Sequence, residues 1–452
     1  MNTITEPILN ELKSLVGPTN VLTDPQQLYR RSQDHYWFSP VLKPQMDGKV
    51  AEVQVSPGST DELLAVIALA VRHRIPLTPR GAGTGNYGQG VPMHGGILLN
   101  HSRLNQILEL TPEAVRVQTG TKLIDIERQA RTVGTELRFY PSTLMTATAG
   151  GFLAGGSGGI GSVTWGTLWD EGNVLGVTVA TIEETPQVLT IQDPEAMKGV
   201  VHNCGLTCFI LDLTLALVPA QPWAQFVVAF DTLETALRCG ETLAYDETLP
   251  KRLVTVLEWP IPGFFRQLTK PGIAPESKSL LLLELVTEPA ELAERVAAQH
   301  GQVTWHSPHE KYHKGGLMLS DFTWNHTTMW VMKADPNYTY LQDSFLPDRV
   351  FEQLQLRKAR YGDDLLAHIE FMKFRGQLGP QGLSIVRFHS KEQLWELMAY
   401  CESIGQVIAN PHTHRLDEDV RWNGQPILDA KTRWDPYKLL NPGHLRVLEE
   451  NQ

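Results

Sequence analysis

Cysteine is scarce in this sequence, with four residues in 452: Cys204, Cys208, Cys239 and Cys401. They form no C-x-x-C pair and are too few to cross-link a chain of this length, which favours a reducing compartment. They also cannot hold an iron–sulfur cluster by themselves. The first residues lack the basic segment and apolar stretch of a secretory signal. We therefore predict a cytoplasmic protein.

A long hydrophobic run and an excess of positive charge are also missing. The longest apolar stretch begins at Ser279 and is interrupted by Glu284, well short of the roughly 18 residues that a membrane span needs. Lys and Arg total 39 against 50 Asp and Glu, a net charge of −11. This sign is wrong for neutralising nucleic-acid phosphates. The sequence predicts neither a transmembrane segment nor a nucleic-acid partner.

The chain does contain intermixed helix and strand patterns, over a length that favours two or three domains. Ser59 and Glu62 form a capping box before an amphipathic helix, and a short strand is predicted at 75–78. After Pro219, apolar strands are followed by amphipathic helices. These patterns predict an α+β fold with a boundary near residues 219–222.

Glycine is concentrated in two segments, RGAGTG at 80–85 and GGFLAGGSGGIG at 150–161. Without a Cβ, glycine lets backbone N–H groups approach phosphate oxygens closely, and it packs poorly inside a helix or strand. We therefore predict loops at both places. A Rossmann fingerprint needs a helix directly after its last glycine, and a P-loop needs a Gly-Lys-Ser/Thr ending. Neither follows Gly85.

Both glycine segments carry a resemblance. The stretch PLTPRGAGTGNYGQGVPMHGGILLNHSRLNQILEL resembles the FAD pyrophosphate loop of the vanillyl-alcohol oxidase/p-cresol methylhydroxylase (PCMH-type) flavoprotein family. It is most similar to the glycolate oxidase subunit and D-lactate dehydrogenase branch. The second segment, from YPSTLMTATAGGFLAGG onward, resembles that family's second FAD segment, and NPGHL at 441–445 matches its C-terminal signature. The resemblance covers roughly residues 45–218 and 400–452.

This resemblance implies an α+β architecture with a PCMH-type FAD-binding domain of two subdomains and an α+β cap, or substrate, domain. The FAD-binding domain would span 1–220, with its core at about 45–220. The cap would span 221–400, and a C-terminal segment, 401–452, would return to the FAD domain. FAD would lie between the subdomains with its isoalloxazine facing the cap.

The family's cofactor contacts can be carried over by position. The diphosphate would be bound by Arg80, Gly81, Ala82, Gly83, Thr84 and Gly85. The flavin or ribityl chain would lie near Asn86, Gln89 and Val91. The second segment would line the cofactor through Pro141, Ser142, Thr146, Thr148, Gly151, Ser157 and Gly161. Ile210 would contact the adenine, and Asn441 belongs to the C-terminal signature. Some branches link a first-loop histidine to the flavin, but Thr84 stands at that position, so we predict non-covalent FAD.

The resemblance also points to catalytic candidates near the C-terminus. GQVIANPHTH aligns with the family's G-G-x-x-S-G-E-H-G, which places His412 on the family histidine. His414 and Arg415 follow, where an imidazole and a guanidinium could face a substrate carboxylate. Without the alignment, both histidines would be expected to satisfy backbone carbonyls in a proline-containing turn.

Further candidates lie in the middle of the chain, where the family's H-x-G-D-G-N-x-H motif is absent. In its approximate position His368 and Glu370 share one face of a predicted strand. His326 is predicted on another cap strand. For these three residues an ordinary polar position on a half-buried strand explains the pattern equally well. No metal site is predicted, and His309 and His313 are assigned to a surface loop because Gly315 and Gly316 follow.

These features predict an FAD-dependent oxidoreductase that oxidises a CH–OH group, foremost of a small 2-hydroxy acid of the glycolate or D-lactate kind. His412 or a neighbour would take the hydroxyl proton, and Arg415 or Lys333 would hold the carboxylate. An uncharged sugar or aromatic alcohol is the alternative substrate. A flavin-binding subunit of a larger redox complex is the alternative from another class. Electrons would pass to oxygen, a quinone or a partner protein.

Overall fold

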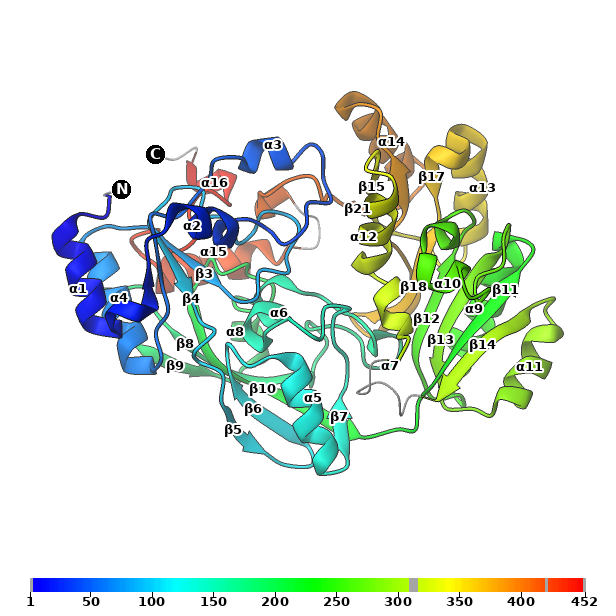
Figure 1. Ribbon diagram of the computed structural model, residues 1–452, viewed down its shortest axis with the longest axis horizontal. Helices are drawn as coiled ribbons and strands as arrows, with labels where there is room; N and C mark the ends of the chain where they lie inside the picture. Colours follow the sequence, from blue (N-terminus) through cyan, green and yellow to red (C-terminus); the bar gives the residue numbers. More distant parts are fainter. Residues whose placement is uncertain (1–2, 309–315, 419–421, 450–452) are drawn as a thin grey trace.

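The structure is a computed structural model that describes residues 3–308, 316–418 and 422–449. Figure 1 shows two bodies side by side. One is built from the N-terminal half and the C-terminal segment, and the other from the middle of the chain. Helices and sheets are mixed in both, so the predicted α+β class is confirmed.

The first subdomain is a small sheet covered by helices. Its strands run in the order β1 (Val21–Leu22), β2 (Val53–Val55), β4 (Ile97–Asn100) and β3 (Leu77–Arg80), and β2, β4 and β3 are parallel. Its helices are α1 (Glu6–Val16), α2 (Pro25–Ser32), α3 (Lys43–Met46) and α4 (Thr60–Arg72). Ser59 caps α4 as predicted by accepting from Glu62 N, while the Glu62 carboxylate accepts from Gly58 N, one residue before the N–H expected for a capping box. The strand predicted at 75–78 starts at Leu77 instead, since Pro76 has no N–H for the ladder.

The second subdomain is a larger sheet centred on the long strand β10. The order is β5 (Ile107–Leu110), β6 (Ala114–Gln118), β10 (Phe209–Pro219), β8 (Val174–Ala180) and β9 (Val188–Ile191), and β7 (Thr135–Leu137) pairs with the end of β10. Its helices are α5 (Leu123–Thr132), α6 (Ala149–Gly155), α7 (Ser162–Trp165) and α8 (Pro194–Met197).

Helix α6 corrects the prediction of a loop over the whole second glycine segment. Thr148 caps the helix by accepting from Gly151 N, and the chain leaves helical geometry only at Gly156. Glycine is needed inside α6 for close packing, because a Cβ on Gly150 would lie 1.8 Å from Thr119 Oγ1. The low helix propensity of glycine is therefore outweighed in α6 by the close packing against Thr119, which only glycine permits.

The middle of the chain forms an antiparallel eight-stranded sheet. Its order is β14 (Gln302–Pro308), β11 (Ala224–Phe230), β13 (Ser279–Leu285), β12 (Lys251–Leu257), β18 (His368–Phe374), β19 (Gln377–Gly382), β16 (Gln342–Ser344) and β21 (Val407–Ala409). A smaller sheet joins β15 (Tyr338–Tyr340), β20 (Ile385–Arg387) and β17 (Leu365–Leu366). The helices are α9 (Leu233–Tyr245), α10 (Arg266–Thr269), α11 (Pro289–Ala297), α12 (Asn325–Ala334), α13 (Val350–Tyr361) and α14 (Lys391–Ser403).

The end of this middle body differs from the predicted return at residue 401. Residue 401 lies inside α14, and the strand after it, β21, still pairs with β16 at the edge of the large sheet. We therefore propose that the cap extends to Ala409.

The last part of the chain packs on the first subdomain. Leu77 forms a parallel bridge with Leu440, with Leu77 N donating to Leu439 O and Asn441 N donating to Leu77 O. Helices α15 (Gly424–Trp434) and α16 (Arg446–Glu449) lie beside the N-terminal elements in Figure 1. Leu439 and Leu440 are buried in the same apolar cluster as β3 and β4.

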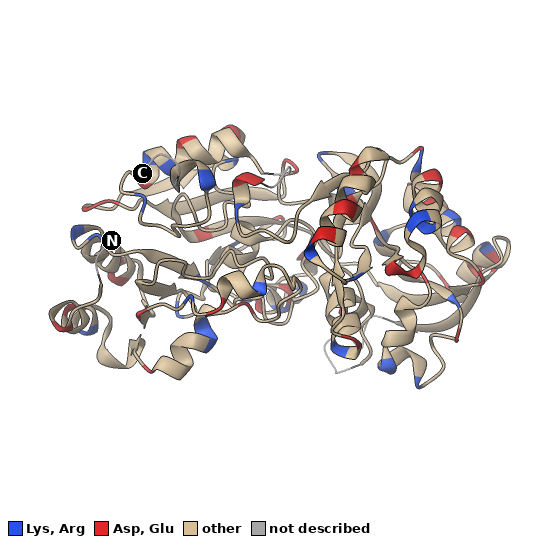
Figure 2. Ribbon diagram, turned by 90° about the horizontal axis from the view of Figure 1, so that it is seen from above, with Lys and Arg blue, Asp and Glu red and all other residues tan. Residues whose placement is uncertain are grey.

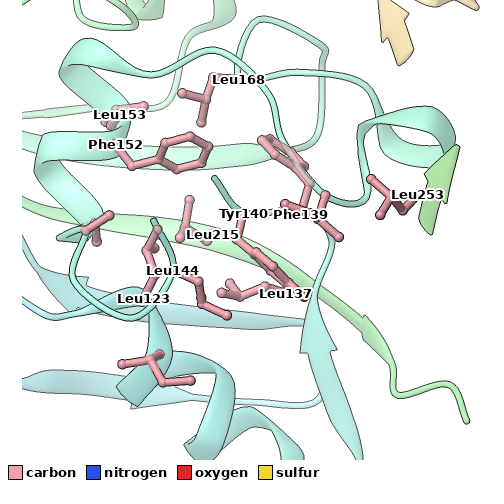
Figure 3. Close-up of a cluster of buried hydrophobic side chains, with 14 of the residues drawn as sticks. Leu123, Leu137, Phe139, Tyr140, Leu144, Phe152, Leu153, Leu168, Leu215 and Leu253 are labelled. Carbon is pink, nitrogen blue, oxygen red and sulfur yellow. The ribbon is translucent and has the colours of Figure 1, made fainter. Parts of the chain in front are cut away.

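A buried ionic network joins the two bodies. Arg252, at the start of β12, contacts Glu136 of β7 and Glu284 of β13 and donates to the hydroxyl of Tyr140 at 2.6 Å. Figure 3 shows Tyr140 in the apolar cluster of the second subdomain, which Leu253 of β12 extends into the middle body. The junction is thus held by both charge and apolar contact.

Acidic and basic residues are intermixed along the ribbon of both bodies, as Figure 2 shows. None of the helices within the described ranges combines the length and the hydropathy that a membrane crossing needs.

Candidate functional site

A narrow cavity of about 120 Å³ lies over the first glycine segment, directly after β3. It brings together ten of the residues assigned to the cofactor: Arg80, Gly81, Ala82, Gly83, Thr84, Gly85, Gln89, Thr148, Gly151 and Ile210. These residues come from both subdomains, so the cavity lies between them, as the resemblance implied.

The first glycine segment offers backbone rather than side chains to this cavity. Gly83 has a φ of +71°, and a Cβ there would lie 2.2 Å from Arg80 Nη2. The Arg80 guanidinium donates to the carbonyls of Gly90 and Gln33, so it holds the loop in shape. Burial lowers the pKa of Arg80 and raises that of the neighbouring Asp34. Asp34 in turn accepts from Gly88 N at 2.7 Å.

A second cavity of about 830 Å³ continues from the first toward the cap. The two share Thr84, Gly85, Gln89, Gly151 and Gly155 in their walls. The second also receives the predicted cofactor residues Asn86, Pro141, Ser142, Thr146 and Ser157. The two together form one long cavity that begins at Ile210 and ends against the large sheet.

Three predicted cofactor residues lie in neither cavity wall. Val91 is buried in a small apolar cluster with Leu42 and Met46. Gly161 has a φ of +108° and donates its N–H to Arg252 O at 2.7 Å. Asn441 Nδ2 donates to the carbonyls of Gln89 and Cys204, at 2.7 and 2.8 Å. These residues hold the walls in place, and the cofactor assignment as a whole stays a prediction.

The cap wall of the large cavity is formed in part by one face of α12. His326, Met329 and Lys333 line it, and their spacing of three and four residues places them on the same side of a helix. The strand predicted around His326 is therefore wrong. Helical spacing puts Thr327, Thr328 and Val331 on the buried face, where alternation would have split them between two faces.

His326 is the imidazole that this helix brings to the cavity. Burial, and then the positive charge of Lys333 and the proximity of His35, lowers the pKa of His326 to about 4. The ring is therefore neutral near pH 7 and able to accept a proton. Its Nδ1 lies 3.9 Å from Asp321 Oδ1, which also lines the cavity.

Glu370 lies on the floor of the cavity, on β18. It accepts from Thr255 Oγ1 at 2.5 Å, from Trp324 N at 2.7 Å and pairs with His368 Nε2 at 2.8 Å. Trp324 is the residue before α12, so Glu370 also fixes the start of the helix that carries His326. His368 and Glu370 share a face of β18, as predicted, but His368 is fully buried behind the wall.

The remaining catalytic candidates lie elsewhere. His412 is buried and placed between Ser39 and the carbonyl of Tyr340. His414 packs edge-on against His444, with ring centroids 5.6 Å apart. Arg415 lines a small pocket beside Tyr87 and Gln89. None of the three is in the wall of the large cavity, so the predicted cluster of catalytic residues is divided between two places.

Sequence reasoning missed part of the cavity wall. His35, Tyr36 and Phe38 line it from a segment before the predicted FAD core. Tyr87 and Gln342 meet across the cavity, because Gln342 Nε2 donates to the Tyr87 hydroxyl. A run of aromatic side chains in a stretch with no helical or strand periodicity was the only signal at 35–38.

Two further predictions concern metals and loops. Within residues 3–308, 316–418 and 422–449 no three His, Cys, Asp or Glu side chains come close enough to hold a metal ion. The surface loop predicted for His309 and His313 lies outside the described residues.

Known proteins are similar to this chain both in sequence, over a region that includes the glycine segments, and in fold. Residues 51–189 match the family model described as an FAD binding domain. The glycolate oxidase subunit GlcD of Bacillus subtilis is 26% identical over 237 residues, covering 51% of this chain and 50% of GlcD. The D-lactate dehydrogenase of Anaerostipes hadrus is 29% identical over 193 residues, covering 41% and 40%. The chain thus spans half or less of the length of these curated relatives.

Solved structures resemble the whole chain. An alkyldihydroxyacetonephosphate synthase superposes with a TM-score of 0.74 at 14% identity, over 98% of this chain and 85% of that protein. The 4-ethylphenol oxidase of Gulosibacter chungangensis gives a TM-score of 0.69 at 15% identity, over 98% of both chains. At this identity the likeness shows the fold, with both bodies included.

Proposed function

Because this chain carries an FAD-binding domain within the PCMH-type fold, we propose that it is an FAD-dependent oxidoreductase acting on a CH–OH group of a small molecule. The observation that carries the proposal is the long cavity, which joins the glycine segments to a half-buried, neutral imidazole on the cap. FAD supplies the hydride acceptor when it is bound.

The first cavity suits a diphosphate. Gly81 and Gly83 let this segment pack closely on its neighbours, since a Cβ on Gly81 would lie 2.5 Å from Thr148 Oγ1 and one on Gly83 would lie 2.2 Å from Arg80 Nη2. Successive backbone N–H groups in such a segment bind phosphate oxygens. We assign residues 80–85 to the diphosphate and Ile210 to the adenine. Thr84 cannot replace the imidazole in the family's histidine–flavin linkage, so we expect the cofactor to be held non-covalently.

His326 is the proposed proton acceptor. When a hydride leaves the alcohol carbon, the hydroxyl proton becomes strongly acidic and must go to a base; the neutral His326 imidazole can accept it although burial lowers its pKa to about 4. The imidazolium that results would be stabilised by Asp321, 3.9 Å away. Glu370 supports this step by holding Trp324, and with it the first turn of α12.

We propose a 2-hydroxy acid as the substrate. Lys333 lies on the same face of α12 as His326, so one helix presents a carboxylate partner and a base together. The names of the relatives, glycolate oxidase subunit and D-lactate dehydrogenase, support the same class.

An uncharged aromatic or sugar alcohol is the second candidate. The two cations in the cavity wall, Lys333 and Arg375, are both exposed, so neither is a buried carboxylate partner. Aromatic side chains, among them Tyr36, Phe345 and Phe374, line much of the same wall. These features suit a substrate with an apolar body.

A third possibility is a flavin-binding subunit of a larger redox complex. The relatives named as subunits favour it. The electron acceptor, whether oxygen, a quinone or a partner protein, would then determine turnover.

Anaerobic mixing of the purified flavoprotein with glycolate, D-lactate, benzyl alcohol and a sugar alcohol separates these candidates. We expect a hydroxy acid to bleach the flavin absorbance, and Lys333→Met to weaken its binding roughly ten- to hundredfold, the worth of a charged hydrogen bond. Lys270→Met, at an exposed cap position outside the cavity wall, is the matched control.

Each other outcome has a clear meaning. Bleaching by benzyl alcohol alone, insensitive to Lys333→Met, would establish the second candidate. If dithionite bleaches the flavin and no alcohol or acid does, the oxidoreductase proposal fails and the subunit remains. Heating the same sample should release the yellow colour into the supernatant, and colour left in the pellet would contradict non-covalent binding.

A further inference from the structure

Residues 33–39, here called the bridge segment, connect the two bodies without forming a helix or strand. Its first end is fixed to the first glycine segment. His35 N donates to Gly83 O at 3.1 Å, and the Arg80 guanidinium donates to Gln33 O. Asp34 accepts from Gly88 N. These bonds place the bridge segment against the loop assigned to the diphosphate.

The other end of the bridge segment is fixed to the cap. Thr339 Oγ1 donates to Phe38 O at 2.7 Å, and the Phe38 ring packs edge-on against Tyr340 at 5.5 Å. Ser39 Oγ lies 2.8 Å from His412 Nδ1, and His412 Nε2 lies 3.0 Å from Tyr340 O. His412 therefore joins the bridge segment to β15.

Between these two ends the bridge segment borders the large cavity. His35, Tyr36 and Phe38 are in its wall. Lys333 Nζ lies 6.0 Å from the centre of the Tyr36 ring, so this wall stands close to the face of α12 that carries His326. Any shift of the bridge segment would change the space in which a substrate binds.

The hydrogen bonds of His412 determine its tautomer. Burial lowers its pKa to about 4, so the ring is neutral and has one N–H donor and one acceptor nitrogen. The Tyr340 carbonyl can only accept, so Nε2 carries the proton and donates to it. Nδ1 must then accept from the Ser39 hydroxyl. The Ser39 oxygen also accepts from Leu42 N at 3.0 Å, which satisfies this serine completely.

We propose that His412 is a positioning residue that fixes the cap end of the bridge segment, and that the bridge segment is a wall of the substrate site. Both nitrogens of the ring are engaged and the residue is 2% exposed, so it has neither a free lone pair nor access to a substrate. The substrate part of this inference rests on the proposed function, and the positioning part stands without it.

Hydrogen exchange, measured by mass spectrometry on the FAD-loaded protein, tests the positioning part with no substrate present. We expect peptides covering residues 33–42 to exchange about tenfold faster in Ser39→Ala and in His412→Ala, because each leaves a buried partner unsatisfied. His412→Asn, whose amide keeps an acceptor near Ser39, should recover part of the protection. His389→Ala, at an exposed cap position, is the matched control and should match the wild type.

Kinetics test the substrate part with any compound that reduces the flavin. Ser39→Ala and His412→Ala should each raise KM about three- to tenfold while the limiting rate of flavin reduction stays within about twofold. The double variant should be no worse than either single one, because both remove the same link.

Two results would overturn the inference. Unchanged exchange at 33–42 in both variants would refute the positioning role, whatever the substrate panel shows. A loss of about 10²–10⁴ in the reduction rate in His412→Ala, with Ser39→Ala normal, would instead show that His412 acts on the substrate as a base. If nothing reduces the wild-type flavin, the proposed function fails while the exchange result still decides the positioning role.

Discussion

The two ends of the long cavity are built from different parts of the polypeptide. At the diphosphate end much of the wall is glycine backbone, with Gly83 at positive φ, and the Arg80 side chain holds backbone carbonyls in place. At the cap end the wall is made of side chains on α12 and on β18. The first end can be changed only by altering the path of the chain. The second can change its chemistry one residue at a time while the fold stays the same.

The cap end is nevertheless held as firmly as the other. Glu370 takes three hydrogen-bond donors, and one of them comes from Trp324, whose backbone has a φ of +52°. An aromatic residue in that region is strained and persists only when its surroundings fix it. The position of α12, and of the imidazole on it, is therefore set by contacts behind the cavity wall.

The largest effect should come from the cap end. His326→Gln removes the proposed base but leaves the helix intact, so we expect flavin reduction by substrate to slow about 10²–10⁴-fold. FAD content, read from the ratio of absorbance at 450 and 280 nm, should not change. If His326→Gln lost its FAD, or kept the wild-type rate of flavin reduction, the two ends of the cavity would not have the separate roles proposed here.

A smaller effect is expected at the diphosphate end. Gly83→Ala places a methyl group where Arg80 lies, and overpacking of this kind costs about 1–3 kcal/mol, which corresponds to roughly a 5- to 150-fold loss of FAD affinity. Gly48→Ala is the matched control, because Gly48 has a similar φ of +78° and nothing within 4 Å of the added Cβ. Titration of the apoprotein with FAD measures both. Equal affinity in the two variants would mean that the shape of the loop does not matter.

The smallest effect is expected on the stability of the folded protein at acidic pH. Burial lowers the pKa of His101, which lines the diphosphate cavity, from 6.5 to about 4 in the folded protein. Between these values the unfolded chain binds a proton that the folded chain does not. The stability is therefore complete above pH 6.5 and falls as the pH drops toward 4, by roughly 1 kcal/mol per pH unit for one such histidine.

Urea unfolding of the FAD-free protein at pH 7 and pH 5 measures this effect. His101→Asn should lose less stability between the two pH values than the wild type does. An identical loss in both proteins would mean that His101 is not the group responsible.

The contrast between the glycine-rich diphosphate end and the side-chain-lined cap end also explains which features could be predicted from the sequence. At the diphosphate end the geometry of the chain demands glycine, so RGAGTG and the second segment were visible as patterns, and the FAD domain, its fold and most of the lining followed from them. The error there was α6, because the room beside Thr119 cannot be seen in a sequence.

The cap end depends on which side chains stand at particular positions. Histidine and lysine are common enough that a single sequence does not distinguish a functional one from an ordinary one. The stretch around His326 is rich in threonine and tryptophan, residues that favour a strand, yet it forms helix α12. His412 matches a family position, but in the structure it lies behind the cavity wall. There it contacts Ser39, which is 373 residues away in the sequence. Such a contact leaves no mark on a single sequence.

The bridge between Leu77 and Leu440 has a consequence for the order of events during synthesis. The strands of the cap lie between residues 224 and 409 and can pair while the ribosome is still translating. Strand β3, which leads into the first glycine segment, gains its neighbour at Leu440 only when residues 439–441 have been made, after every strand of the cap. Contacts between such distant residues form slowly. The cap is therefore expected to fold first, and the first glycine segment to reach its final form only afterwards.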